Sequence, residues 1–302
     1  MKPFSILVDS SCDLPPEFIQ EHGIDVLPML FTLDDREYPD GAWLEITPKE
    51  FYEKLKIGGV AKTTQINPEE WVAVFTKYAE RGEDLICLVL SSGLSGSAGN
   101  AAIAADEVNE RFPNSKIYAI DSLSATGGHG VLASLAVQKR SEGLSAADTA
   151  SFLEKIKHQV FAFFTVDDLN FLHRGGRLSK LSAVAGSLLG VKPMLNISPE
   201  GTLQLKEKVR KRKAALELLI TQMNRCLEPG DDIGRFAITH CDCEEDAKKL
   251  AGMIMDIYKA DQPMIMAMSP IIGAHTGPGA ITLFFAGNLT HAEYEEKYYS
   301  KK

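Results

Sequence analysis

The sequence predicts an α/β protein made of two domains. The chain has 302 residues, about twice the length of a common single domain. In its first half, short apolar runs alternate with helix-like segments, an order typical of a mainly parallel sheet covered by helices. Near residue 160 the pattern changes to aromatic and apolar runs with hairpin-like spacing, which indicates a mixed sheet. We therefore predict an N-terminal domain over 1–160 and a C-terminal domain over 161–302, with the boundary at about 158–162.

The N-terminal half supplies the elements of a parallel sheet. Apolar runs that end in polar residues predict strands at 5–9, 85–90 and 116–120, and a turn at Asp34-Asp35 predicts an edge hairpin within 24–38. Proline-containing start signals and helix-like stretches predict helices at 17–22, 48–55, 68–81, 100–111, 128–141 and 146–158. Because ligands of such sheets lie at the carboxyl ends of the strands, the polar segments 9–10, 91–97 and 121–122 are expected along one edge.

The C-terminal half reads as strands and helices in closer succession. Apolar runs predict strands at 160–166, 193–197, 203–205, 234–239, 264–268 and 281–286. Helices are predicted at 167–172, 182–189, 214–225 and 244–258, the second of them rich in small residues. No internal repeat is evident.

Bulk composition excludes several classes of protein. The net charge of −9 argues against nucleic acid as a main partner, because binding phosphates needs a basic surface. No apolar run approaches the roughly 20 residues that span a bilayer, so stable membrane insertion is not expected. The N-terminus lacks a signal-peptide pattern, and five cysteines in a chain of this length do not form a disulfide framework. We expect a cytoplasmic protein with reduced thiols.

A glycine-serine loop at 91–99 follows the predicted strand 85–90 and precedes a predicted helix. Backbone N–H groups, hydroxyls and a helix dipole then surround one point, which suits an anion. The loop lacks the Walker and dinucleotide glycine spacings, and it misses the nucleophile elbow by one residue. The neutral donors that remain, such as the hydroxyls of Ser95 and Ser97, suit a carboxylate better than a polyphosphate. The alternative is an ordinary strand-to-helix turn with a serine cap.

Two further segments carry candidate side chains. Glycines and a proline at 273–279 predict a tight loop that presents His275, which could donate to an anion, act as an acid or base, or be merely structural. Arg174 and Arg177 flank a glycine pair that could approach an anion closely, or that could simply end a helix.

Two other segments favour structural interpretations. The residues His240-Cys241-Asp242-Cys243 have metal-ligand types but no second ligand pair, so we predict a strand end and no metal site. The basic run 206–213 is typical of a solvated helix start, and it could also dock an acidic partner.

Taken together and in this order, the motifs resemble those of the DegV family of bacterial fatty-acid-binding proteins. The matching segments span nearly the whole chain: Asp9-Ser10-Ser11-Cys12-Asp13-Leu14, Lys62-Thr63-Thr64-Gln65, Ser92-Gly93-Leu94-Ser95-Gly96-Ser97, Asp121-Ser122, Leu172-His173-Arg174-Gly175-Gly176-Arg177-Leu178 and Gly273-Ala274-His275-Thr276-Gly277-Pro278-Gly279. The resemblance implies a two-domain fold with a parallel α/β/α N-terminal domain and a mixed-sheet C-terminal domain. It also implies a long-chain fatty acid buried between them.

The resemblance assigns the residues that hold the carboxylate. The family's threonine, serine and histidine fall on Thr63, Ser95 and His275, and its backbone N–H donor falls on Gly96. Thr64, Ser97, Arg174 and Arg177 are secondary candidates. The family's usual Thr-Ser-Gln-Pro reads Thr-Thr-Gln-Ile at 63–66, which keeps the second hydroxyl and loses the proline.

By the same resemblance, the protein is not itself an enzyme and needs no cofactor. It would present its fatty acid to a separate ATP-dependent fatty acid kinase, and the acyl phosphate would enter phospholipid synthesis. Arg174, Arg177 or Arg210 could contact the kinase. The preferred acyl chain, the residues around it and the oligomeric state are not predicted.

Two alternatives stay open at this point. One is a lipid or acyl-phosphate hydrolase that uses Ser95 or His275, with Asp9 or Asp121 orienting the histidine. The other is a distant relation to dihydroxyacetone kinase subunits, in which His275 binds a small carbonyl compound.

Overall fold

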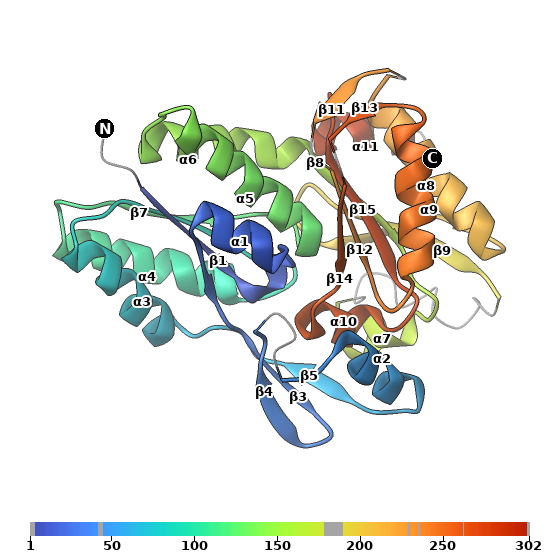
Figure 1. The fold of residues 1–302 in the computed structure, drawn as a ribbon, viewed down its shortest axis with the longest axis horizontal. Helices are drawn as coiled ribbons and strands as arrows, with labels where there is room; N and C mark the ends of the chain where they lie inside the picture. The colour runs from blue at the N-terminus through green and yellow to red at the C-terminus, as the bar shows by residue number, and fades with distance from the viewer. Residues whose placement is uncertain are drawn as a thin grey trace.

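A computed structural model describes residues 4–41, 45–177, 190–228, 230–234, 236–261 and 263–300. Its two main sheets are a parallel sheet built from the first half of the chain and a mixed sheet built from the second half (Figure 1). The predicted α/β class with these two kinds of sheet is confirmed. The division into domains at 158–162 stays a prediction.

The parallel sheet has the strand order β2-β1-β6-β7. Its strands are β1 (Ser5–Asp9), β2 (Ile24–Leu27), β6 (Leu85–Val89) and β7 (Ile117–Asp121). The helices around it are α1 (Pro16–His22), α3 (Pro68–Glu80), α4 (Ser97–Arg111), α5 (Thr126–Ser141) and α6 (Ala146–Ile156). In Figure 1, α3 and α4 lie below this sheet while α5 and α6 lie above it, so helices cover both faces. Every residue of β6 is buried, as expected for a strand covered on both faces.

The mixed sheet has the strand order β10-β9-β8-β15-β12-β14. Its strands are β8 (Val160–Thr165), β9 (Lys192–Ile197), β10 (Leu203–Val209), β12 (Ala237–His240), β14 (Met264–Ala267) and β15 (Ile281–Ala286). Only the β12–β14 pairing is parallel within the described ranges. The helices α8 (Arg212–Cys226), α9 (Glu244–Met255) and α11 (His291–Tyr299) follow β10, β12 and β15.

The two faces of the mixed sheet belong to different cores, because side chains alternate along a strand. Phe161 and Phe163 of β8 join the core with α8, α9 and α11, together with Phe285 and Tyr294. Ala162 and Phe164 point to the other side and join the core that contains the parallel sheet. This second face approaches α5, which contacts β8, β12 and β15.

A small three-strand unit and several short elements complete the described fold. The strands β3 (Leu30–Leu33), β4 (Arg36–Pro39) and β5 (Ala61–Thr63) pair antiparallel, which confirms the hairpin at Asp34-Asp35. The remaining elements are α2 (Pro48–Lys56), α7 (Asn170–Arg174), α10 (Pro270–Thr276), β11 (Asp232–Gly234), β13 (Lys259–Ala260) and the 3-10 turns at Ser10–Cys12 and Lys157–Gln159. The predicted capping signals of α2 and α3 both form complete capping boxes.

Several predicted elements differ from the structure. Helix α4 begins at Ser97 and not at residue 100, because Gly99 is accommodated within its first turn. The basic run 206–213 is a helix start only in its last two residues, since α8 begins at Arg212. Its first part continues β10 to Val209, where Lys206 pairs with Glu295 and Glu207 pairs with Arg225. The short helix predicted at 167–172 lies at Asn170–Arg174. The predicted helix 182–189 lies outside the described residues.

Long apolar helices are missing from the described ranges. None of the helices there combines the length and apolarity that crossing a membrane would require.

Candidate functional site

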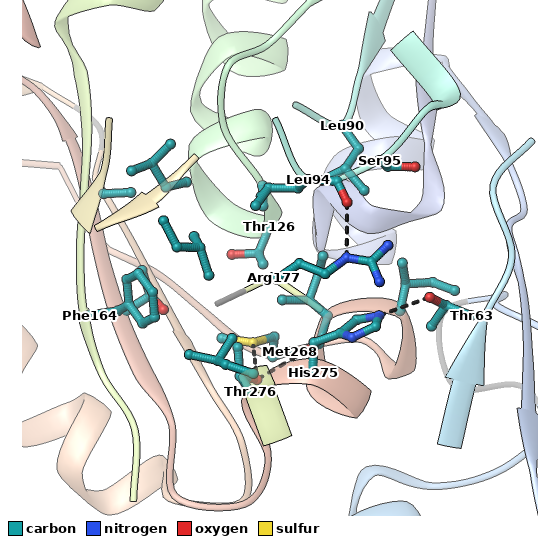
Figure 2. A pocket seen from close by; sticks show the side chains of 18 of the residues that line it. Thr63, Leu90, Leu94, Ser95, Thr126, Phe164, Arg177, Met268, His275 and Thr276 are labelled. Carbon is teal, nitrogen blue, oxygen red and sulfur yellow. Dashed lines mark hydrogen bonds between the residues drawn. The ribbon is translucent and has the colours of Figure 1, made fainter. Parts of the chain in front are cut away.

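A largely apolar cavity of about 250 Å³ lies where the loop after β6, strand β5, helix α10 and the mixed sheet meet (Figure 2). Its apolar walls come from strands of the mixed sheet and from the segments that follow β6 and β14, and they include Leu90, Leu94, Ala162, Phe164, Ile197, Met268 and Phe284. Arg177 and His275 lie with Thr63 and Ser95 at the side of β5 and the 91–96 loop, while Thr126, Thr276 and Thr282 are single polar residues among the apolar walls. The cavity therefore has one polar end and an apolar body.

Thr63, Ser95 and His275, which are far apart in the sequence, all line this one cavity. Thr63 Oγ1 lies 2.9 Å from His275 Nε2, within hydrogen-bond distance. Thr63 reaches this position because it ends β5, a strand that we did not predict, and pairs there with Phe31 of β3.

His275 does not lie in the tight loop that the glycines and proline predicted. It lies in the last turn of α10, which starts at Pro270 and ends where Gly277 adopts a φ of +74°. Gly175 allows the ring to sit against the backbone of the segment after α7. A Cβ at position 175 would stand 2.2 Å from His275 Nδ1, so a larger residue there would displace the imidazole.

The environment of His275 keeps its imidazole neutral at neutral pH. Burial lowers the pKa of His275 to about 4, and the nearby positive charge of Arg177 adds to this effect. A neutral imidazole donates through one ring nitrogen and accepts through the other. His275 can therefore take part in a hydrogen-bond chain with Thr63, but it does not supply a positive charge.

Ser95, Gly96 and Ser97 have different positions around the start of α4. Ser95 lines the cavity, and its hydroxyl lies 3.1 Å from that of Ser97. Ser97 is buried as the first residue of the helix and accepts a hydrogen bond from the Ile66 N–H at 3.2 Å, so it is not the cap residue. Gly96 is the cap, and it lines an adjoining hollow together with Ser95. A Cβ on Gly96 would stand 2.1 Å from Gln65 Oε1.

Of the two arginines in the 174–177 segment, one lines the cavity and the other does not. Arg177 is half-buried and lines the cavity, and its Nε donates to Leu94 O at 3.1 Å (Figure 2). Its Nη1 donates to Gly175 O at 2.5 Å. Arg174 is exposed, does not line the cavity, and stacks its guanidinium over the Phe171 ring at 4.6 Å. Among the secondary candidates, Arg177 and Thr64 reach the cavity, whereas Arg174 and Ser97 do not.

Arg210 and the His240–Cys243 segment lie apart from the cavity. Arg210 is exposed just after β10. His240 ends β12, as predicted for this segment, and Cys241 beside it is buried. In the described part of the chain, no group of three or more His, Cys, Asp or Glu residues could hold a metal ion.

A hydrolytic triad is not assembled at this site. Among the described residues, no aspartate or glutamate lines the cavity. Asp9 accepts hydrogen bonds from the N–H groups of Leu90 and Ser11, and Asp121 accepts from the N–H groups of Ser92 and Leu123. These two carboxylates hold the loops at the strand ends and do not contact His275, so the acid that a triad needs is not in place.

Sequence reasoning did not separate the residues that form the apolar walls from the rest of the core. Phe161, Phe163, Met264 and Met266 do not line the cavity, whereas Phe164 and Met268 do. The alternation of faces along β8 was the available signal, since Ala162 and Phe164 share one face.

The sequence is similar over nearly its whole length to a known protein family and to several of its members. The sequence model of the DegV family, described as uncharacterised proteins, matches residues 3–288. A DegV domain-containing protein of Clostridium perfringens is 37% identical over 289 residues, which cover 95% of this chain and 99% of the relative. One of Lactococcus lactis is 36% identical over 282 residues, covering 93% and 96% of the two chains.

Solved structures of similar proteins have the same fold. A DegV family protein from Thermus thermophilus, described as binding fatty acid, superposes with a TM-score of 0.85 at 28% identity, over 95% of this chain and 100% of that one. DegV from Bacillus subtilis, described as a fatty acid binding protein, gives a TM-score of 0.80 at 31% identity with the same coverage.

Proposed function

This chain belongs to the DegV family, and we propose that it is a carrier that binds one long-chain fatty acid in the apolar cavity. The carboxylate would lie at the polar end and the acyl chain among the apolar walls. The observation that carries this proposal is that Thr63, Ser95 and His275 line one end of the same cavity. Residues of 1–160 and of 161–302 both line it, which supports the further proposal that the ligand lies between two domains.

The polar end has the groups that a buried carboxylate requires. A carboxylate offers about four lone-pair positions, and each one left without a donor inside a protein costs free energy. The hydroxyls of Thr63 and Ser95 can donate, and His275 can orient the Thr63 hydroxyl. The Gly96 N–H has no acceptor among the described residues; Gly96 lines the adjoining hollow beside Ser95, and its N–H would be a further donor to a carboxylate that reaches that side.

The negative charge of the ligand would be balanced by Arg177. His275 stays neutral because its pKa is lowered to about 4, so it cannot balance that charge at neutral pH. Arg177 lines the cavity next to Leu94 and carries a permanent charge. We therefore propose that Arg177 binds the ligand, and we no longer count it among the residues expected to contact the kinase.

The acyl chain would supply most of the gross affinity. Burial of each methylene contributes about 0.8 kcal/mol, so a chain of about 16 carbons offers much more than the head group does. The polar end would then fix the orientation and keep the carboxylate within reach of a reagent at the surface.

The proposed reaction partner is a separate ATP-dependent fatty acid kinase. A carboxylate oxygen would attack the terminal phosphorus of ATP, the bond to the ADP oxygen would break, and acyl phosphate and ADP would form. The 91–99 loop has no Walker spacing, so the nucleotide would come with the kinase. The acyl phosphate would then enter phospholipid synthesis in the cytoplasm.

The exposed arginines are the proposed contacts with this kinase. Arg174 and Arg210 are both exposed, and reversing their charges should abolish phosphorylation while the fatty acid stays bound. Arg177 is a poor probe of docking because it lines the cavity. Docking by these residues would be refuted if the reversed variants were phosphorylated at the normal rate.

Native mass spectrometry of the purified protein tests the carrier function directly. We expect a mass gain that equals one fatty acid and that disappears after delipidation and returns with added palmitate. Incubation with an acyl ester should release no product. Absence of any fatty acid adduct, or turnover of the ester, would contradict the proposal.

A further inference from the structure

The apolar body of the cavity contains a second polar feature, a group of threonine hydroxyls. Thr126 and Thr282 line the cavity, and Thr239 Oγ1 lies 2.9 Å from Thr126 Oγ1. Thr239 and Thr282 are direct partners in the antiparallel pairing of β12 with β15. Their side chains therefore project from the same face of the sheet, with Cβ atoms about 5 Å apart. We call Thr126, Thr239 and Thr282 the threonine cluster.

The threonine cluster lies away from the polar end of the cavity. Thr282 pairs with Phe164 where β15 meets β8. Figure 2 shows Phe164 on the side of the cavity opposite Thr63, with Thr126 between them. A ligand that holds its carboxylate at the polar end would therefore bring the middle or the distal part of its chain to the threonine cluster.

Two glycines bring the start of α5 close to the mixed sheet. A Cβ on Gly127 would stand 2.9 Å from Ala237 Cβ, so a larger residue there would push the helix away from β12. A Cβ on Gly128 would likewise stand 2.7 Å from the Phe284 ring. Thr126, the first residue of the helix, has a φ of +46°, which β-branched residues rarely adopt. The Thr-Gly-Gly sequence therefore holds a hydroxyl at the wall of the cavity.

Thr282 differs from the other threonines of the apolar walls in the state of its hydroxyl. It is only 5% exposed, and its side chain forms no hydrogen bond with any residue that the structure describes. By contrast, Thr126 Oγ1 is paired with Thr239 Oγ1, and Thr276 Oγ1 donates to Ile272 O at 3.2 Å. A buried hydroxyl without a partner costs free energy, so Thr282 points to a ligand that carries a hydrogen-bonding group at this depth.

We propose that the threonine cluster binds a hydroxyl on the acyl chain, so that the cavity accepts long-chain hydroxy fatty acids as well as unsubstituted ones. This inference rests on the proposed carrier function and names a class of ligand for it. The ligand hydroxyl would form a hydrogen bond with Thr282. Because a single hydrogen bond joins Thr126 to Thr239, one of their two protons is left as a second donor.

The test compares ligands that differ only in a hydroxyl, on delipidated protein. They are palmitate, 2-hydroxypalmitate, 10-hydroxypalmitate and 12-hydroxypalmitate, and their affinities are measured by displacement of a fluorescent fatty acid. Thr282→Val removes the hydroxyl and keeps the shape of the side chain, while Thr282→Ser keeps the hydroxyl. Thr276→Val is the matched control, because Thr276 also lines the cavity but its hydroxyl already donates to the backbone.

We expect the wild-type protein to bind at least one of the two internal hydroxy acids within about threefold of palmitate. Thr282→Val should weaken that ligand by roughly tenfold, because its hydroxyl would be buried with one partner fewer, and should leave palmitate bound at least as tightly. Thr282→Ser should bind the hydroxy acid like the wild type. In Thr276→Val the ratio of the two affinities should change by less than about twofold.

The inference would be overturned if the wild-type protein bound both internal hydroxy acids more than about tenfold more weakly than palmitate. Equal weakening of palmitate and the hydroxy acid in Thr282→Val would also overturn it, as would an equally selective loss in Thr276→Val. The hydroxyl of 2-hydroxypalmitate would lie at the polar end, so dependence of its affinity on Thr282 would contradict the assignment as well. Failure of the wild-type protein to bind palmitate would instead refute the carrier function, so the two failures are distinguishable.

Discussion

The polar end of the cavity and its apolar body are built from different parts of the chain. At the polar end, Thr63, Ser95 and His275 stand on short or glycine-flanked segments and contribute single polar groups. The body is lined by side chains such as Phe164 and Phe284, which belong to the regular strands of the mixed sheet.

This difference separates two properties of the proposed carrier. The polar end would set where the carboxylate lies, through a few hydrogen bonds that each contribute about 1 kcal/mol. The body would set how long a chain fits, through many small apolar contacts. Substitutions at the two ends should therefore change different measurements.

The largest effect is expected from filling the body. Ala162 of β8 is buried and lines the cavity, so Ala162→Phe would occupy space that the chain needs. Exclusion of about four methylenes would cost about 3 kcal/mol, roughly a 150-fold loss of palmitate affinity. Decanoate should be affected much less.

Isothermal titration with fatty acids of increasing length measures this effect. Ala162→Val serves as the graded control and should shift the preferred length by a smaller amount. A uniform loss for decanoate and palmitate would show that the polar end, and not the body, had been disturbed.

A smaller effect is expected from removing one hydroxyl at the polar end. Ser95→Ala and Thr63→Val should each weaken palmitate by roughly tenfold, because one hydrogen bond to the carboxylate is lost. The loss should be the same for every chain length and should extend to kinase-dependent phosphorylation. Ser92→Ala, at an exposed serine of the same loop, is the control. Unchanged affinity in Ser95→Ala would remove that residue from the site.

Gly175→Ala tests whether close backbone approach positions the histidine. The added Cβ would stand 2.2 Å from His275 Nδ1, so the imidazole must move and its contact with Thr63 should break. We expect about a fivefold loss of palmitate affinity, somewhat below that of a deleted hydrogen bond. Gly99→Ala on α4, where the added Cβ meets nothing within 4 Å, should leave binding unchanged. Equal affinities in the two variants would contradict a positioning role for Gly175.

The last expected effect concerns stability and not affinity: it is a pH dependence of the stability of the delipidated protein. The pKa of His275 is about 4 in the folded chain, below the usual value of 6.5, so the unfolded chain binds more protons between these values. The contribution of neutral His275 to the free energy of unfolding is therefore fully present above about pH 6.5 and is lost as the pH falls toward 4. His275→Gln should show a shallower decline than the wild type in thermal unfolding followed over this range. Parallel curves would contradict a buried neutral histidine.

Two residues of the polar end could be singled out from local sequence patterns, whereas Thr63 was assigned only through the family resemblance. The glycine-serine loop and the 273–279 segment are conspicuous without any knowledge of packing, and Ser95 and His275 do line the cavity. The local conformation was less predictable. Glycines suggested a loop around His275, yet Pro270 starts a helix there that packs against β5 and α7.

The body could not be predicted because its residues resemble the rest of the core. Met266 and Met268 are only two residues apart and chemically identical, but one lies in the edge strand β14 and the other follows it into the cavity. Strand β5 was missed for a related reason. Its three residues carry no pattern of their own and become a strand only through pairing with β3.

The way in which Arg177 is held has a practical consequence for work with the purified protein. The backbone carbonyl oxygens of Leu94 and Gly175 hold its guanidinium, so a positive charge is fixed beside the apolar walls by the protein itself. Such a site would scavenge anionic amphiphiles from a cell extract, and detergents with sulfate head groups would compete for it. A binding measurement on protein isolated without delipidation would then follow the exchange of bound endogenous lipid for the added ligand. The apparent dissociation constant would depend on how the protein was prepared.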